Sequence, residues 1–171
     1  DPVTHQFRVL KMLGIDLRDN RLELWPSKED DEYIENFLNK EWLSADQKII
    51  GINIGASKRW LTKCWPKSRI AKLCDELGLK NMRVVVTGTE EDAGEANELA
   101  AMVKNTKIIN ACSKTSVNQL AALIKRCSLY ISTDSSPSRI AVAVGVPVIA
   151  LFGRTDPARH MPPAKNQIII R

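Results

Sequence analysis

From residue 48 onward the chain alternates short aliphatic runs with helix-forming segments, and this alternation restricts the fold more than any other feature. The aliphatic runs are continuous, as is typical of strands that are buried on both faces of a parallel sheet. We expect strands at 49–54, 83–87, 107–109, 129–132, 146–151 and 167–170, and helices at 67–77, 90–104, 116–126 and 137–144. The predicted fold class is α/β with a doubly wound parallel sheet, which binds ligands beyond the carboxyl ends of its strands.

The first 47 residues have a different organisation, and we interpret them as a helical lead-in to a domain of residues 48–171. The chain begins on Asp1 rather than on a methionine, and it ends on the strand-like run "NQIIIR". We therefore expect it to be one piece of a longer protein.

Local signals within this lead-in predict its elements. An apolar helical pattern at 4–13 ends at Gly14, which suits the left-handed residue after a helix. We expect a short strand at 21–25. The sequence "SKED" at 27–30 resembles a capping box for a helix that runs to about residue 40. In the later helices we expect Gly78 to end helix 67–77, and Ser116 to cap the next one with Gln119.

Composition excludes several classes of protein. With 44% hydrophobic and 26% charged residues and no run of about 18 apolar residues, we expect a cytoplasmic protein without a membrane span or signal peptide. The four cysteines lack C-x-x-C spacing, and the two histidines are far apart. We therefore expect buried, reduced thiols and no metal site. The net charge of +5 is spread over the chain without a nucleic-acid motif, so we expect no nucleic-acid partner.

Three loops at predicted strand ends carry unusual residues. The first, "GASKRWLTKCWP" at 55–66, offers the Ser57 hydroxyl and the Lys63 ammonium to an anion. A loop held by its tryptophans, with surface lysines, explains the same residues equally well. The second, "TGTEED" at 87–92, begins a helix whose positive end suits Glu90 and Glu91. A ribose hydroxyl is the functional partner that one of these glutamates would take.

The third loop lies within "STDSSPSRIAVAVGVPVIALFG", residues 132–153. Pro137 is preorganised for the first turn of a helix, and the N–H groups there attract an anion. Ser135, Ser136 and Arg139 would add hydroxyls and a fixed positive charge. Asp134 would be repelled by phosphate, so we expect it to cap the helix or to accept from a sugar hydroxyl. An ordinary helix cap explains Asp134 but accounts less well for the other polar residues together.

These loops resemble one known family. The sequences "GINIGAS…KCWP", "VVVTGTEED" and "KTSVNQLAALIKRCSLYISTDSSPSRIAVAVGVPVIALFGRTDPAR" resemble the carboxyl-terminal, donor-binding half of the ADP-heptose:lipopolysaccharide heptosyltransferases. Those bacterial glycosyltransferases have the GT-B fold, built from two Rossmann-like domains. The resemblance covers most of the chain from residue 48, and the K-x-W-P element and the D-S-x-P to T-D-P run are specific in combination.

The resemblance implies a nucleotide-sugar donor, ADP-heptose, with no cofactor. By resemblance, Ser57 and Lys63 lie at the diphosphate and Thr115 lies near the base and ribose. Glu90 or Glu91 holds the ribose, and Asp134, Ser135 and Ser136 meet the sugar and phosphates. The sequence departs from the usual D-S-G-P-x-H pattern at Ser136 and Arg139, and Arg139 can replace the histidine as a phosphate donor.

The implied reaction is sugar transfer with inversion and without a required metal. The implied partners are a lipid-linked saccharide acceptor at the inner-membrane surface and an amino-terminal domain of the same protein. That domain supplies the catalytic base, which is absent from this chain. The alternative is a non-catalytic nucleotide-binding module, favoured by the departures at Ser136 and Arg139. A dinucleotide oxidoreductase is disfavoured because no G-x-G-x-x-G follows the first predicted core strand.

Overall fold

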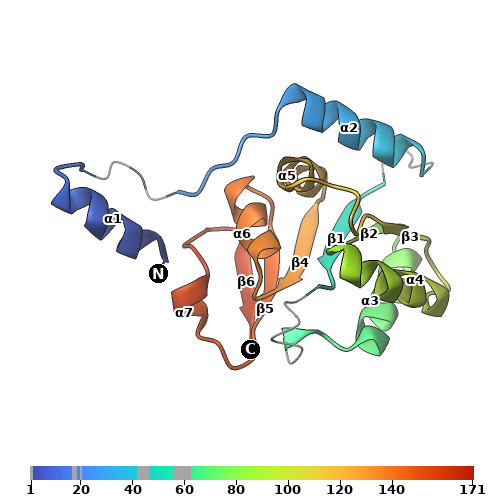
Figure 1. Cartoon of the computed structure of the whole chain (residues 1–171). Coiled ribbons are helices and arrows are strands. Elements are labelled where there is room, and N and C mark those ends of the chain that lie inside the picture. The colour runs from blue at the N-terminus through green and yellow to red at the C-terminus, as the bar shows by residue number, and fades with distance from the viewer. Residues whose placement is uncertain (1, 17–18, 20, 42–46, 56–62) are drawn as a thin grey trace.

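A computed structural model describes residues 2–16, 19, 21–41, 47–55 and 63–171. Its centre is a six-stranded, all-parallel sheet in the order β3-β2-β1-β4-β5-β6 (Figure 1). The strands are β1 (Ile49–Asn53), β2 (Arg83–Thr87), β3 (Ile108–Asn110), β4 (Leu129–Thr133), β5 (Val148–Leu151) and β6 (Gln167–Ile170). This doubly wound arrangement confirms the predicted fold class.

Helices cover both faces of the sheet, and each face has its own apolar core. One core includes α2, α5 and α6, with α2 packed on α5 and α5 on α6; the other includes α3 and α4, which pack together. The described helices are α1 (Pro2–Met12), α2 (Lys28–Asn39), α3 (Lys67–Leu79), the 3₁₀ turn η2 (Glu90–Asp92), α4 (Ala93–Met102), α5 (Val117–Lys125), α6 (Ser136–Ala143) and α7 (Pro157–His160). Within the described ranges, no helix has both the length and the apolar character needed to span a membrane.

A buried tyrosine crosses the middle of the sheet. Tyr130 of β4 is fully buried, and its hydroxyl lies 2.5 Å from Oγ1 of Thr87 on β2. Its ring therefore passes over Gly51 of β1, the strand that separates β4 from β2. A Cβ on Gly51 would lie 2.3 Å from the ring, so only glycine fits there.

Three cysteines confirm the prediction of buried thiols. Cys74, Cys112 and Cys127 are buried in the core. Burial raises the pKa of Cys74 and Cys127 to about 12 and that of Cys112 to about 11. These three side chains act as small apolar groups at neutral pH rather than as nucleophiles.

Two predictions of local structure were wrong. Residues 21–25 form no strand: the segment runs between α1 and α2, outside the sheet, and none of the described strands pairs with it (Figure 1). Gly78 does not end α3, which continues to Leu79. A Cβ on Gly78 would lie 2.4 Å from the carbonyl oxygen of Asn105, so Gly78 permits a close approach of two backbones.

Helix ends account for the other differences and agreements. The expected helix 90–104 is divided into η2 and α4 and ends at Met102, and α7 was not predicted. The capping boxes at Ser27 and Ser116 are confirmed, since each hydroxyl accepts from the backbone three residues later. Gly14, two residues after the last residue of α1, has φ +76, as its sequence position indicated.

Candidate functional site

Polar side chains gather where the strand order reverses, between β1 and β4. Among the described residues, the buried polar or charged ones are Asn53, Thr87, Ser132, Thr133, Asp134 and Ser138. These six lie at the carboxyl ends of β1, β2 and β4 or in the first turn of α6. The carboxyl ends beside such a reversal are where doubly wound sheets bind their ligands.

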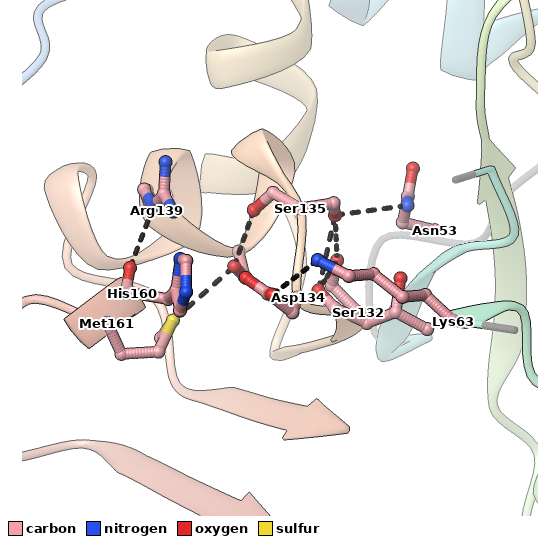
Figure 2. Close-up of polar contacts among 10 residues, drawn as sticks. Asn53, Lys63, Ser132, Asp134, Ser135, Arg139, His160 and Met161 are labelled. Atoms are coloured by element: carbon pink, nitrogen blue, oxygen red, sulfur yellow. Dashed lines mark hydrogen bonds and ion pairs between the residues drawn. The ribbon is translucent and has the colours of Figure 1, made fainter. Parts of the chain in front are cut away.

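The strongest contact in this cluster is an ion pair. Lys63, which follows the loop after β1, donates from Nζ to Oδ2 of Asp134 at 2.6 Å (Figure 2). The lysine side chain is 22% exposed and the aspartate side chain 5%. Two regions 71 residues apart in the sequence therefore meet through a nearly buried carboxylate.

The carboxyl group of Asp134 stays ionised at neutral pH. Burial acts to raise its pKa, but the hydrogen bond from Lys63, the Thr155 hydroxyl and the positive charge of Lys63 act in the opposite direction. The net effect lowers the pKa below its ordinary value near 4. Asp134 is thus a negative charge inside the candidate site.

Hydroxyl groups connect β1 to the beginning of α6. Asn53 donates from Nδ2 to the Gly55 carbonyl at 2.7 Å and to Ser135 Oγ at 3.4 Å. Ser135 Oγ lies 2.9 Å from Ser132 Oγ, and it donates to the Thr133 carbonyl at 3.2 Å (Figure 2). These bonds fix the position of the first turn of α6 relative to β1.

Helix α6 begins without a side-chain cap. Ser135 is the N-cap residue, and its side chain makes no capping hydrogen bond. Asp134 is therefore not the N-cap residue of α6, and its carboxylate is paired with Lys63 instead. Ser138 donates from Oγ to the Ser135 carbonyl at 2.7 Å, and Ser136 is exposed at the first helical position. The positive end of the helix dipole points toward the strand ends.

Arg139 is held by α7, an element that the sequence did not predict. Its Nε donates to the His160 carbonyl at 2.8 Å (Figure 2). The guanidinium is thereby fixed one turn into α6, on the side that faces the loop after β5.

Two threonine hydroxyls nearby are buried without a satisfactory partner. Among the described residues, Thr133 Oγ1 and Thr155 Oγ1 are buried side-chain oxygens that lack a hydrogen bond. Thr155 lies near enough to Asp134 to lower its pKa, although the geometry falls short of a hydrogen bond. Unpaired buried donors are costly, so a ligand oxygen that met them would stabilise the site.

The remaining predicted residues lie at other strand ends. Glu90 and Glu91 are exposed in η2, after β2, and Thr115 is half-buried in the loop between β3 and α5. Ser57 lies outside the described residues. Within the part of the chain that the structure describes, no three His, Cys, Asp or Glu side chains are grouped to hold a metal ion.

The comparison with known families now decides the identity. The sequence profile of glycosyltransferase family 9 (heptosyltransferase) matches residues 3–171. The chain belongs to this family.

Curated relatives agree with this assignment. Lipopolysaccharide heptosyltransferase 3 of Escherichia coli K12 is 35% identical over 117 residues, which are 67% of this chain and 34% of that protein. Lipooligosaccharide heptosyltransferase 2 of Haemophilus influenzae is 31% identical over 143 residues, which are 82% of this chain and 41% of that protein. The chain thus spans well under half the length of these relatives.

Solved structures give the same result. A family 9 glycosyl transferase from Veillonella parvula has a TM-score of 0.87 at 29% identity, covering 95% of this chain and 46% of that one. The E. coli ADP-heptose lipopolysaccharide heptosyltransferase II has a TM-score of 0.76 at 27% identity, covering 87% and 45%. The Rossmann-like architecture of a GT-B glycosyltransferase is therefore shown for this chain.

Sequence reasoning missed several residues that shape this candidate site. Asn53 and Ser132 lie within the predicted strands 49–54 and 129–132, so the sequence analysis grouped them with the apolar runs rather than with the polar groups of the site. Asp92 belongs to the predicted helix start, and its Oδ2 accepts from the backbone N–H and hydroxyl of Thr89 at 2.7 and 2.8 Å, as the partner of Thr89 in a capping box. A Cβ on Gly55 would lie 2.3 Å from this same oxygen. Asp92 therefore fills the space between the ends of β1 and β2. For Asn53 and Ser132, the signal available in the sequence was a polar residue near the end of an apolar run.

Proposed function

We propose that this chain is the donor-binding half of a glycosyltransferase that transfers a heptose-type sugar from an ADP-sugar to a lipopolysaccharide-core acceptor. The main support is a positive charge at the place where the strand order reverses. Lys63 is held there by Asp134, next to the start of α6, which has no side-chain cap, in a chain of family 9. A lysine and a helix N-terminus together form a site for an anion such as a diphosphate.

The chemistry of transfer needs positive charge at this position. An acceptor hydroxyl attacks the anomeric carbon as the bond from that carbon to the diphosphate breaks, and negative charge grows on the leaving phosphate. Preorganised positive groups stabilise such charge. Lys63, the N-terminus of α6 and Arg139 take this role in the proposal, with Ser57 beside Lys63 at the diphosphate.

The other predicted residues complete the donor site. Thr115 takes a place near the base and ribose, and Glu90 or Glu91 binds the ribose. Ser135, Ser136 and Asp134 meet the sugar and its phosphates. These residues lie in the segments that follow β2, β3 and β4, which agrees with ligand binding along the carboxyl edge of the sheet.

The proposal places the catalytic base and the acceptor site in an amino-terminal domain of the same protein, with residues 1–47 as the segment between the two domains. The acceptor is then a lipid-linked saccharide at the inner-membrane surface. Inversion and independence from metal belong to the same proposal. The 171-residue chain alone should bind donor without transferring sugar, and turnover by it would contradict this division of roles.

Nucleotide titrations test the central assignment. Lys63→Ala should weaken ADP binding by about 1.5–3 kcal/mol, the range for hydrogen bonds to charged groups, while adenosine binding stays nearly unchanged. Calorimetry with ADP, UDP, GDP and adenosine measures both effects and the choice of base.

A matched control lies at the start of α3, four residues after Lys63. Lys67 pairs with Glu98 at 2.5 Å between α3 and α4, so Lys67→Ala also breaks a lysine–carboxylate pair. It should leave ADP affinity unchanged. Equal loss for ADP and adenosine in Lys63→Ala would show that Lys63 shapes the loop, and no change in either would remove it from the phosphate site.

A further inference from the structure

We infer that Asp134 is a selectivity residue, which favours a nucleotide that carries a sugar over the bare nucleoside diphosphate. The inference rests on the proposed function, because it concerns how the same donor site distinguishes two ligands. Its basis is the partner that Asp134 already has. The Asp134 carboxylate is already paired with the Lys63 ammonium, which an entering phosphate would need as its own partner.

The geometry forces an exchange of partners. Nζ of Lys63 lies 2.6 Å from Oδ2 of Asp134, and the carboxylate is almost completely buried. A phosphate oxygen that takes over Lys63 must weaken this bond. It also brings a second negative charge close to the first, in surroundings where water screens little.

The displaced carboxylate then needs a new donor. An ionised carboxylate can only accept hydrogen bonds. Burying it without a donor costs more free energy than burying an unpaired neutral polar group. The positive charge of Lys63 acts on it, and the Thr155 hydroxyl lies nearby. The Nε donor of Arg139, however, is bound to the His160 carbonyl.

A sugar supplies the missing donors, whereas a bare diphosphate does not. The hydroxyls of a sugar on the terminal phosphate can donate to Asp134 while the phosphates take Lys63. The terminal phosphate of a nucleoside diphosphate without this sugar brings acceptor oxygens and negative charge, but no hydroxyl donors, to Asp134. The pair therefore penalises the product nucleotide relative to the donor, which would favour release of the nucleotide after transfer.

Asp134→Asn tests this directly, because the variant keeps the size of the side chain and removes its charge. Titration calorimetry of the 171-residue chain with ADP and with ADP-heptose is the measurement. ADP should bind at least about 5-fold more tightly to the variant, and ADP-heptose should bind equally or more weakly. The preference for the sugar-bearing ligand should thus fall.

Controls separate the charge from the fold. Glu98→Gln removes the carboxylate of the Lys67–Glu98 pair and should change neither affinity. Circular dichroism verifies folding, and Asp134→Ser, a smaller neutral replacement, should show the same fall in preference if Asp134→Asn folds poorly.

Each outcome bears on a different claim. If Asp134→Asn binds ADP no more tightly, or tightens both ligands equally, the selectivity inference is overturned while nucleotide binding by the parent chain still supports the proposed function. If the parent chain binds neither ADP nor ADP-heptose, the proposed function and the inference both fail.

Discussion

Two polar pairs join distant segments of this sheet, and they differ in what surrounds them. Tyr130 and Thr87 meet inside the sheet, where the tyrosine ring fills the space above Gly51. Lys63 and Asp134 meet at the carboxyl edge, where the lysine is partly exposed and threonine hydroxyls lack partners. Both members of the first pair are enclosed by the core, whereas the lysine of the second pair is partly open to solvent. Complete enclosure by packed side chains thus distinguishes the structural pair from the pair in the candidate site.

The largest expected effect breaks the packed pair. Gly51→Ala should lower the free energy of unfolding by about 3 kcal/mol, because the new Cβ would meet the Tyr130 ring at 2.3 Å. Gly94→Ala is the matched control: no atom lies within 4 Å of its Cβ, and alanine favours helix. Urea unfolding of both variants measures the difference. Equal stability would show that the ring moves aside without cost.

A smaller effect is expected at the exchangeable pair. Lys63→Met should lower the free energy of unfolding by about 1–3 kcal/mol, because Asp134 would remain buried without its donor. The double variant with Asp134→Asn should recover part of this loss, since the orphaned charge is then removed. The same urea experiment tests it. A double variant less stable than Lys63→Met would contradict the pairing.

The smallest effect is the dependence of stability on pH. The pKa of Asp134 is lower in the folded chain than its ordinary value near 4. Its ionisation therefore stabilises the fold above about pH 4, and this contribution is lost as the pH falls through the folded pKa. Asp134→Asn should flatten the acid part of a stability–pH curve, whereas Glu32→Gln on the exposed side of α2 should not. An identical slope in all three proteins would show that Asp134 gains nothing from Lys63.

Sequence alone predicted the sheet well, because valine and isoleucine runs such as 83–87 have few alternatives to a buried strand. The sequence-based prediction failed where the structure of a residue depends on a neighbour that is distant in the sequence. A glycine at position 78 is typical of a helix end, but here glycine is needed because the carbonyl of Asn105 leaves no space for a Cβ. Residues 21–25 have the composition of a strand, but no partner strand lies beside them.

The candidate site divides in the same way. Lys63 and Asp134 were chosen by chemistry and by family resemblance, and the structure brings them together. That they contact each other was not predictable, because 71 residues separate them and phosphate, rather than Asp134, was the expected partner of Lys63. The lysine is consequently less exposed than the solvated surface residue that the alternative interpretation assumed.

The order of the strands has a consequence for how the chain folds. β1 lies at the centre of the sheet, yet its register with β4 pairs Ile50 with Leu129, about 80 residues later in the chain. The pairing of β1 with β4 therefore spans β2, β3 and their helices in the chain. Bringing together the ends of so long a segment costs entropy before packing offsets it. We expect slow folding through a partly assembled β1–β2–β3 unit, whose open β1 edge would be a site for wrong pairing until β4 arrives.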